Sequence, residues 1–354
     1  MEAKESTRTR IGFSRMEKKY EWKDHVIFMG ILLAMAVWVN RGIEIKGLYM
    51  DDLYFWSCYG EQSFLQYVFP VGSTRFRFLY YLAAWLEMAV VRNHVGWFVP
   101  FNILLNAAVS WSIYFIGRRL SRAKGIGFLC GSMFLISRMA YYQIGQVLGL
   151  METMALWMAV MILWYLFRYL NEKDSHVYFY LSCVLYFGVC FVHERYMALF
   201  PLLLLVLLFK RSRKLWEWGA GFLSFLLVQI IRAFTIGSIL PAGTGGTQVA
   251  DTFSLADTFK YALSQIAYVF GINAGPEHLN GCPWGQSPLA IKGLVLLADA
   301  CIAVIVLAFL VKLVREKRKE YRVQMLKNST LFILFTGLCI ASSSVTIRVE
   351  MRWV

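Results

Sequence analysis

The sequence predicts an all-α polytopic membrane protein with about nine transmembrane helices. Hydrophobic residues make up 58% of the 354 residues, whereas charged residues make up only 16%. The apolar residues gather in long runs, and the charges fall in short clusters between those runs. A water-soluble protein of this length could not cover so much apolar surface with so few charges, so lipid must solvate much of the chain.

Nine apolar runs are long enough, or nearly so, to cross a bilayer, which takes about 20 helical residues. Two of them, 26–40 and 196–210, are short and would need flanking residues or a thinned bilayer. The first run follows a basic tail and lacks the small-residue cleavage pattern of a secretory signal peptide, so we expect a retained signal anchor. The expected spans are 26–40, 95–117, 125–143, 147–168, 177–193, 196–210, 216–238, 290–312 and 329–347.

The basic clusters set the expected orientation, because cytoplasmic loops carry an excess of Lys and Arg. The tail 1–25 and the clusters 118–124, 210–215 and 312–327 all lie in the cytoplasm if a tenth apolar run, 76–92, does not cross. If 76–92 crossed, two dense clusters would lie outside while the tail stayed inside. We therefore expect 76–92 to form an amphipathic helix at the outer interface.

Within the transmembrane domain, 26–354, two large segments then face outward, 41–94 and 239–289. The second is a Gly- and Pro-rich loop around a short helix expected near 258–271. Its GTGG sequence lacks the Lys-Ser/Thr of a phosphate-binding P-loop, so we interpret it as a flexible turn. The chain ends directly after a charged run beyond the ninth span, which indicates either truncation or an unusually short fold.

Composition also bears on partners and cofactors. The net charge of +14 suggests nucleic acid at first, but no basic stripe interleaved with exposed aromatics appears, so we expect the lipid bilayer and no nucleic acid as a partner. The seven cysteines show no zinc or redox spacing. Cys58 and Cys282 fall in the outer segments, where they either form a disulfide or are small buried hydrophobes. No metal-ligand constellation is visible; a divalent metal stays an open alternative.

Charges within or bordering the expected spans are costly in lipid unless they face a polar cavity or a partner. Most of them lie toward the outer ends of the spans, which predicts one polar cavity that opens outward. The alternative is structural pairing, of Arg138 with Glu152 or of Glu194 with Arg348. These outer residues are Arg138, Glu152, His193, Glu194, Arg195, Arg232, Arg348, Glu350 and Arg352, whereas Asp299 lies near mid-membrane.

An acidic doublet, Asp51-Asp52, follows the first span and is embedded among aromatic residues. Adjacent carboxylates near an apolar surface raise each other's proton affinity. One of the two could then act as a general base toward a hydroxyl or an amine. The alternative is a helix N-cap or a surface turn, where Asp is also common.

Two arginines, Arg75 and Arg77, open the expected interfacial helix. Near a helix N-terminus at the level of the headgroups they could grip a phosphate. The alternative is that they reach toward anionic lipid, as long basic side chains do at interfaces.

Taken together, these features resemble the GT-C superfamily of membrane glycosyltransferases. The resemblance rests on Asp51-Asp52 after the first span, on the STRFRFLYY run (73–81), on YYQIGQVLGLMETMAL (141–156) and on HERY (193–196). The combination looks most like bacterial polytopic transferases of the GtrII type. A span number of nine is low for the superfamily, and the large soluble outer domain of some members is absent.

The resemblance implies a function at the outer face of a bacterial plasma membrane. It implies transfer of a sugar from a polyprenyl-phosphate carrier to a saccharide or lipid-linked acceptor, with Asp51 or Asp52 as the base. Departure of the lipid phosphate builds negative charge that fixed cations would stabilise. The residues implied in substrate or phosphate binding are Arg75, Arg77, Arg138, Glu152, His193, Glu194 and Arg195.

Two other functions stay open. A transporter or flippase for lipid-linked saccharides would also need charged side chains in a cavity, but it should show broken helices at mid-depth and related halves, and no internal repeat is visible. A non-catalytic scaffold or a polymerase accessory subunit would tolerate replacement of Asp51 and Asp52 by Asn, whereas a transferase would lose turnover.

Overall fold

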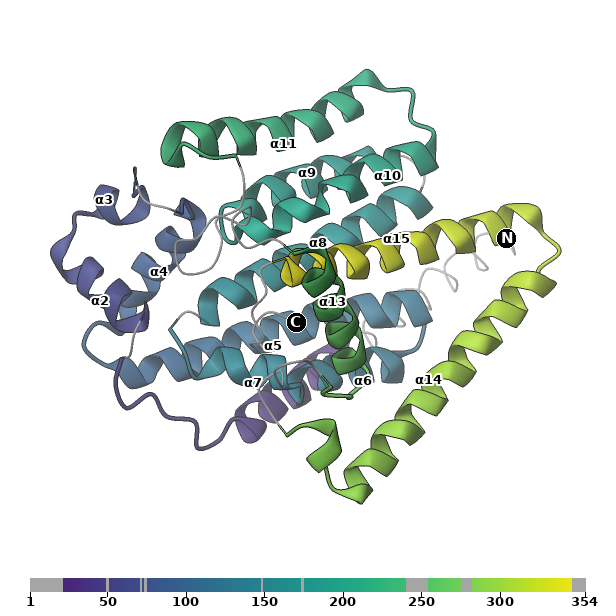
Figure 1. The fold of residues 1–354 in the computed structure, drawn as a ribbon, viewed down its shortest axis with the longest axis horizontal. Helices are drawn as coiled ribbons and strands as arrows, with labels where there is room; N and C mark the ends of the chain where they lie inside the picture. The colour runs from purple at the N-terminus through teal and green to yellow at the C-terminus, as the bar shows by residue number, and fades with distance from the viewer. Residues whose placement is uncertain are drawn as a thin grey trace, which may run out of the picture. The chain divides into compact units, whose positions relative to one another are not determined.

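A computed structural model describes residues 22–48, 51–70, 72, 75–147, 149–172, 175–239, 254–274 and 282–345 of the chain. The regular elements in this part are all helical (Figure 1). After a helix over Trp22–Val39 come α2 (Asp51–Glu61), α3 (Phe64–Val68), α4 (Phe78–Val91), η1 (Val95–Trp97), α5 (Phe98–Ser121), α6 (Lys124–Leu135), α7 (Arg138–Ile144), α8 (Gly149–Asn171), α9 (His176–Cys190), η2 (Glu194–Leu199), α10 (Phe200–Lys210), α11 (Leu215–Ile236), α13 (Leu255–Val269), η4 (Trp284–Gln286), α14 (Leu289–Arg315) and α15 (Lys319–Ser344).

Six of the described helices are long and apolar enough to cross a membrane. They support the prediction of a helical membrane protein, but helix length does not establish nine spans. The six are Trp22–Val39, Val95–Ser121, Gly149–Asn171, Leu215–Ile236, Leu289–Arg315 and Lys319–Ser344.

The other three expected spans take shorter forms. The run 125–143 is broken after Leu135, because Ser137 starts a new helix by accepting a hydrogen bond from the N–H of Ala140. The run 177–193 becomes α9, with 15 residues. The run 196–210 divides into the 3-10 helix η2 and α10, with 11 residues. At 1.5 Å per residue an 11-residue helix is only about 17 Å long.

The chain divides into two compact units, which are described separately. Unit 1 comprises Met1–Leu53 and Val91–Thr153, and unit 2 comprises Tyr54–Val90 and Met154–Val354.

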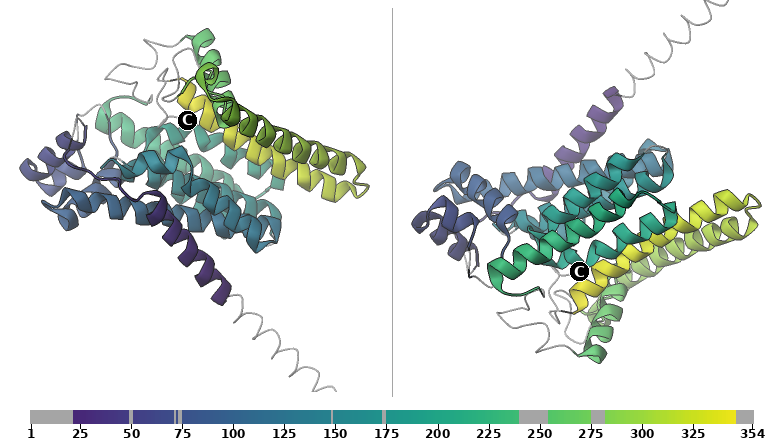
Figure 2. Two further views of the ribbon diagram at one scale, coloured as in Figure 1. Left: turned by 90° about the horizontal axis from the view of Figure 1, so that it is seen from below. Right: turned by 90° about the horizontal axis from the view of Figure 1, so that it is seen from above.

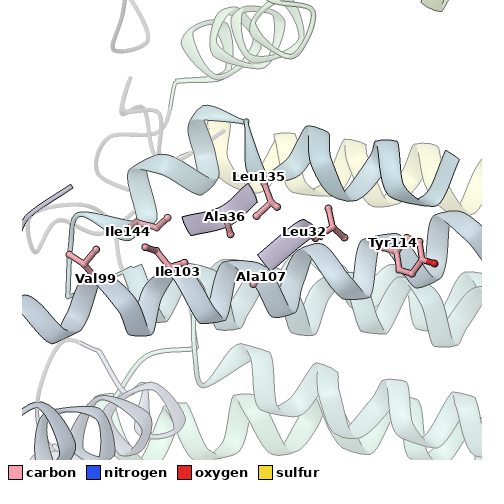
Figure 3. Close-up of a cluster of buried hydrophobic side chains, with 8 residues drawn as sticks. All are labelled: Leu32, Ala36, Val99, Ile103, Ala107, Tyr114, Leu135 and Ile144. Atoms are coloured by element: carbon pink, nitrogen blue, oxygen red, sulfur yellow. The ribbon is translucent and has the colours of Figure 1, made fainter. Parts of the chain in front are cut away.

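In unit 1 the helix Trp22–Val39, α5, α6 and α7 share one apolar core (Figure 3). Close packing of α5 on α6 depends on glycine: a Cβ at Gly127 would lie 2.6 Å from the Tyr114 carbonyl oxygen. Small residues that let two helix backbones approach are typical of helix pairs in lipid. The core contains Leu32, Ala36, Val99, Ile103, Ala107, Tyr114, Leu135 and Ile144.

In unit 2, α9, α10 and α11 pack on one another lengthwise (Figures 1 and 2). One end of this bundle is fastened by the Glu217 carboxylate, which is fully buried. It accepts hydrogen bonds from the hydroxyls of Tyr169, at 2.7 Å, and Ser212, and it contacts the ring of His176. Lys214 lies 2.7 Å from the other nitrogen of that ring. These contacts join α8, α9 and α11 next to the expected cytoplasmic cluster 210–215.

Most of the expected interfacial run 76–92 is helical, as α4, and its residues up to Val90 belong to unit 2. Aromatic rings join it to its neighbours: the Trp85 ring centroid lies 4.6 Å from that of Tyr59 in α2 and 5.3 Å from that of Tyr67 in α3. The short helix expected near 258–271 is α13. All seven cysteines are free thiols, so the structure has no disulfide between Cys58 and Cys282.

The last two long helices, α14 and α15, meet at the turn 316–318 and diverge from it (Figure 1). No residue of α14 is buried. An apolar helix whose side chains are exposed throughout is the kind of surface that lipid covers.

Candidate functional site

The acidic doublet forms the start of α2 and belongs to unit 1. Its two members differ in surroundings: Asp51 is exposed, whereas Asp52 is half-buried. The Asp52 carboxylate accepts a hydrogen bond from the backbone N–H of Val147, with Oδ2 and N 3.2 Å apart. Asp52 is therefore the member of the doublet whose direction is fixed by the fold.

Val147 lies in the tight turn between α7 and α8, a turn that leaves no room for a side chain at Gly149. A Cβ there would lie 1.7 Å from the Gln143 carbonyl oxygen. The Gln143 side chain in turn accepts a hydrogen bond of 3.0 Å from the Thr153 hydroxyl. The end of α7 and the start of α8 are thus held together directly beside the group that binds Asp52.

Two further residues of the expected outward cavity lie in unit 1. Arg138 is the first residue of α7, but its side chain lies outside the described part of the structure. Glu152 lies in the first turn of α8 and is half-buried. A pair between Arg138 and Glu152 therefore stays a prediction.

In unit 2 the Arg77 guanidinium and the Glu194 carboxylate form a two-pronged ion pair. Arg77 Nε lies 2.6 Å from Glu194 Oε2, and Arg77 Nη2 lies 2.7 Å from Glu194 Oε1. Both residues are buried, with exposed fractions of 6% and 4%. Glu194 therefore has a buried ion-pair partner in Arg77, whereas its pairing with Arg348 stays a prediction, because Arg348 lies outside the described residues.

Further arginine side chains lie near this pair. Arg75 Nε lies 4.0 Å from Glu194 Oε1, and the Arg75 side chain is about one-third exposed. Arg232 of α11 is buried and interacts electrostatically with Glu194 and Arg77. Arg195, next to Glu194 in the chain, is half-buried and interacts electrostatically with His193. Several guanidinium groups therefore gather at the turn between α9 and η2.

The two titratable groups of the turn between α9 and η2 respond to this charge. Burial, followed by the positive charges of Arg77 and Arg195, holds the pKa of His193 well below its ordinary value. Burial alone would raise the pKa of Glu194, but Arg77 outweighs it and holds that pKa well below its ordinary value. Both shifts reflect the arginines that surround the turn.

Sequence reasoning missed two sets of polar residues. Asn102 and Asn106 lie one turn apart on α5, and both are buried. The other set is the contact of Glu217 with Tyr169 and His176. The available signal was the polar character of Asn102, Asn106 and Glu217 inside apolar runs, where lipid makes unpartnered polar groups costly.

Each cluster has a definite chemical capacity. A carboxylate that is held in one direction and half-exposed can accept a proton from a hydroxyl group. A group of arginines can bind an anion such as a phosphate and stabilise charge that develops on it. Among the described residues, no group of three or more His, Cys, Asp or Glu side chains comes together to hold a metal ion.

No protein-family model, no curated protein and no solved structure matches the chain.

Proposed function

We propose that the chain is a membrane glycosyltransferase that moves a sugar from a polyprenyl-phosphate carrier to a saccharide or lipid-linked acceptor on the outer face of a bacterial plasma membrane. It has a GT-C-like fold of about nine spans, with α4 at the outer interface and the N-terminus in the cytoplasm. The observation that carries the proposal is the gathering of Arg75, Arg77 and Arg232 near Glu194. Guanidinium groups held close together in this way are suited to bind the phosphate of a donor.

The reaction assigns different roles to the two clusters. The Asp52 carboxylate takes the proton of an acceptor hydroxyl, and the acceptor oxygen forms a bond to the anomeric carbon of the sugar. The bond between that carbon and the phosphate oxygen breaks, and its electron pair stays on the polyprenyl phosphate. The fixed positive charge of the arginines stabilises the negative charge that develops on the phosphate oxygen.

The arginines near Glu194, namely Arg75, Arg77, Arg195 and Arg232, differ in how exposed their side chains are, and we propose different roles for them on that basis. Arg77 forms the two-pronged ion pair with Glu194 and is deeply buried. Its role is therefore to fix the position of Glu194 and of the turn around it. Arg75 and Arg195 are less buried and are the members that a phosphate can reach. Arg232 is buried and adds positive charge near Glu194.

The test is sugar transfer by the full-length protein in nanodiscs, supplied with a panel of radiolabelled polyprenyl-phosphate hexoses and with envelope polysaccharide of the source organism. Asp52→Asn should abolish turnover, and Arg75→Gln should raise the KM for the donor. Lys46→Gln is the matched control, because Lys46 is an exposed cation in the same outer segment. Transfer by none of the donors, or an Asp52→Asn variant as active as the parent, contradicts the proposal.

The same nanodisc preparation tests the flippase alternative. In proteoliposomes a flippase would move a fluorescent polyprenyl-phosphate sugar between leaflets without forming a glycosidic bond. Movement without transfer, sensitive to Arg75→Gln but not to Asp52→Asn, would favour that function.

A further inference from the structure

Asn102 of α5 makes the contacts on which a further inference about unit 1 rests. Its side chain is 1% exposed. The amide nitrogen Nδ2 donates to two backbone carbonyl oxygens, that of Ile144 at 3.1 Å and that of Gln146 at 2.8 Å. Carbonyl groups in the last turn of a helix have no partner within that helix, so Asn102 satisfies the end of α7 and the turn that follows it.

One of these carbonyls belongs to the same peptide group that binds Asp52. The C=O of Gln146 and the N–H of Val147 are the two ends of a single planar peptide, and in a trans peptide they point in opposite directions. Asn102 Nδ2 holds the oxygen end at 2.8 Å, and the nitrogen end donates to Asp52 Oδ2 at 3.2 Å. The chain of contacts therefore runs from Asn102 through one peptide group to the carboxylate.

The surrounding core prevents this peptide from turning. The Ile144 side chain packs in the apolar cluster with Val99 and Ile103, which flank Asn102 on α5 (Figure 3). On the other side, the close approach at Gly149 fixes the start of α8. With both flanks held, the direction of the Val147 N–H depends on the hydrogen bond at the opposite end of the peptide. Hydrogen bonds in such a chain also polarise one another in a low dielectric.

We infer that Asn102 is a positioning residue for the Asp52 carboxylate, acting through the peptide group between Gln146 and Val147. The inference rests on the proposed function, because it gives Asp52 the role of the base. Asn102 does not touch substrate. It fixes the direction in which Asp52 presents its other carboxylate oxygen, and misplacement of a reacting group by about 1 Å can cost on the order of 100-fold in rate.

Asn106 provides a matched control one turn along the same helix. It is also fully buried, and its Nδ2 donates to a carbonyl of the same helix α7, that of Ala140, at 2.8 Å. That carbonyl lies inside α7 and not in the peptide that binds Asp52. Loss of the Asn106 amide therefore costs a similar buried hydrogen bond without releasing Val147.

The experiment compares Asn102→Leu with Asn106→Leu in the full-length protein in nanodiscs. Leu has the same number and branching of side-chain heavy atoms as Asn, although it is larger, and it removes the donors; the larger volume affects both variants alike. We expect Asn102→Leu to speed hydrogen exchange of the Val147 amide at least tenfold and to lower the kcat of sugar transfer by about 10- to 100-fold, with the KM for the donor within twofold. Asn106→Leu should leave the Val147 amide and kcat near those of the parent protein.

Several results would overturn the inference. One is equal exchange of the Val147 amide in the two variants, and another is faster exchange in Asn102→Leu with unchanged kcat. If the Leu variants do not fold, Asn102→Ser and Asn106→Ser, which keep one hydroxyl donor, give the same comparison. Asp52→Asn distinguishes failure of the proposed function from failure of the inference about Asn102. Full turnover in that variant would show that Asp52 is not the base and would contradict the proposed function, whatever the rate of hydrogen exchange of the Val147 amide.

Discussion

Arg77 and Glu194, which are 117 residues apart in the chain, share two hydrogen bonds of 2.6 and 2.7 Å in a buried site. The planar fork of a guanidinium matches the two oxygens of a carboxylate, which gives this contact a defined geometry as well as energy. Because Arg77 lies just before α4 and Glu194 begins η2, the pair ties the α4 region to the turn between α9 and η2.

Removal of one partner should therefore be costly. Arg77→Met leaves the Glu194 carboxylate buried without its main cation, and such changes typically cost about 3–5 kcal/mol of stability. The double variant Arg77→Met/Glu194→Leu also removes the carboxylate that interacts with the buried Arg232, so it should recover only part of that loss. Urea or thermal unfolding of the protein in detergent measures both variants. A double variant as stable as the parent would show that Arg232 does not depend on Glu194.

Stability should fall with acidification in two steps. The pKa of His193 lies well below 6.5 in the folded protein, so the unfolded chain binds a proton that the folded protein does not. Its contribution is complete above pH 6.5 and declines below it, by at most about 1.4 kcal/mol per pH unit. Glu194 acts in the same direction but only below pH 4.5, because its pKa is also lowered.

The first step can be assigned with His193→Gln, which has no titrating group. Its free energy of unfolding should decline less steeply between pH 6.5 and 5 than that of the parent. A variant with an unchanged slope would mean that another histidine causes the decline.

Helix positions followed from the apolar runs, but helix lengths did not. Hydropathy over 125–143 is continuous, and only the local hydrogen bond of Ser137 to the N–H of Ala140 divides it into α6 and α7. A run of apolar residues predicts that a segment is shielded from water, but it does not predict that the segment forms one continuous helix. The nine expected spans therefore became six long helices and several shorter ones among the described residues.

For the candidate site, residue types were predictable and pairings were not. Asp52, Arg77 and Glu194 stood out as charges beside apolar runs. Their partners, the Val147 N–H and each other, depend on segments that only the fold brings together. Glu194 and Arg77 were both assigned to substrate or phosphate binding, and the structure pairs them with each other, a pairing that the sequence did not predict.

Gly149→Ala should disrupt the turn that holds Asp52. The added Cβ would lie 1.7 Å from the Gln143 carbonyl oxygen, which the backbone cannot accommodate without a shift. We expect a loss of about 1–3 kcal/mol of stability and a large loss of sugar transfer. Gly145→Ala is the control in the same turn: its Cβ would be 3.9 Å from the nearest atom, of Ile43, and its φ of −78° suits alanine. Equal activity of the two variants would contradict this explanation.

Glu217→Gln should lower stability without a direct effect on transfer. Its carboxylate receives the Tyr169 and Ser212 hydroxyls and contacts His176, all at the bundle end next to the cluster 210–215. Loss of the buried charge among these donors should cost about 1–3 kcal/mol. Tyr169→Phe, which removes one donor, should cost less. A fall in kcat for either variant at a temperature where it remains folded would assign this end of unit 2 a part in the reaction.

The orientation of the chain can be tested with one native and one introduced thiol. Cys282 is exposed and lies in the segment expected outside, so a membrane-impermeant maleimide should label it in intact cells. Arg122 is an exposed residue at the end of α5, within the basic cluster 118–124. In a Cys58→Ser/Cys282→Ser background, which removes both thiols expected outside, Arg122→Cys should be labelled only after the cells are permeabilised, because dense Lys and Arg clusters stay in the cytoplasm. Label on the Arg122→Cys variant in intact cells would place the basic cluster outside, and sugar transfer at the outer face by Asp52 would then be excluded.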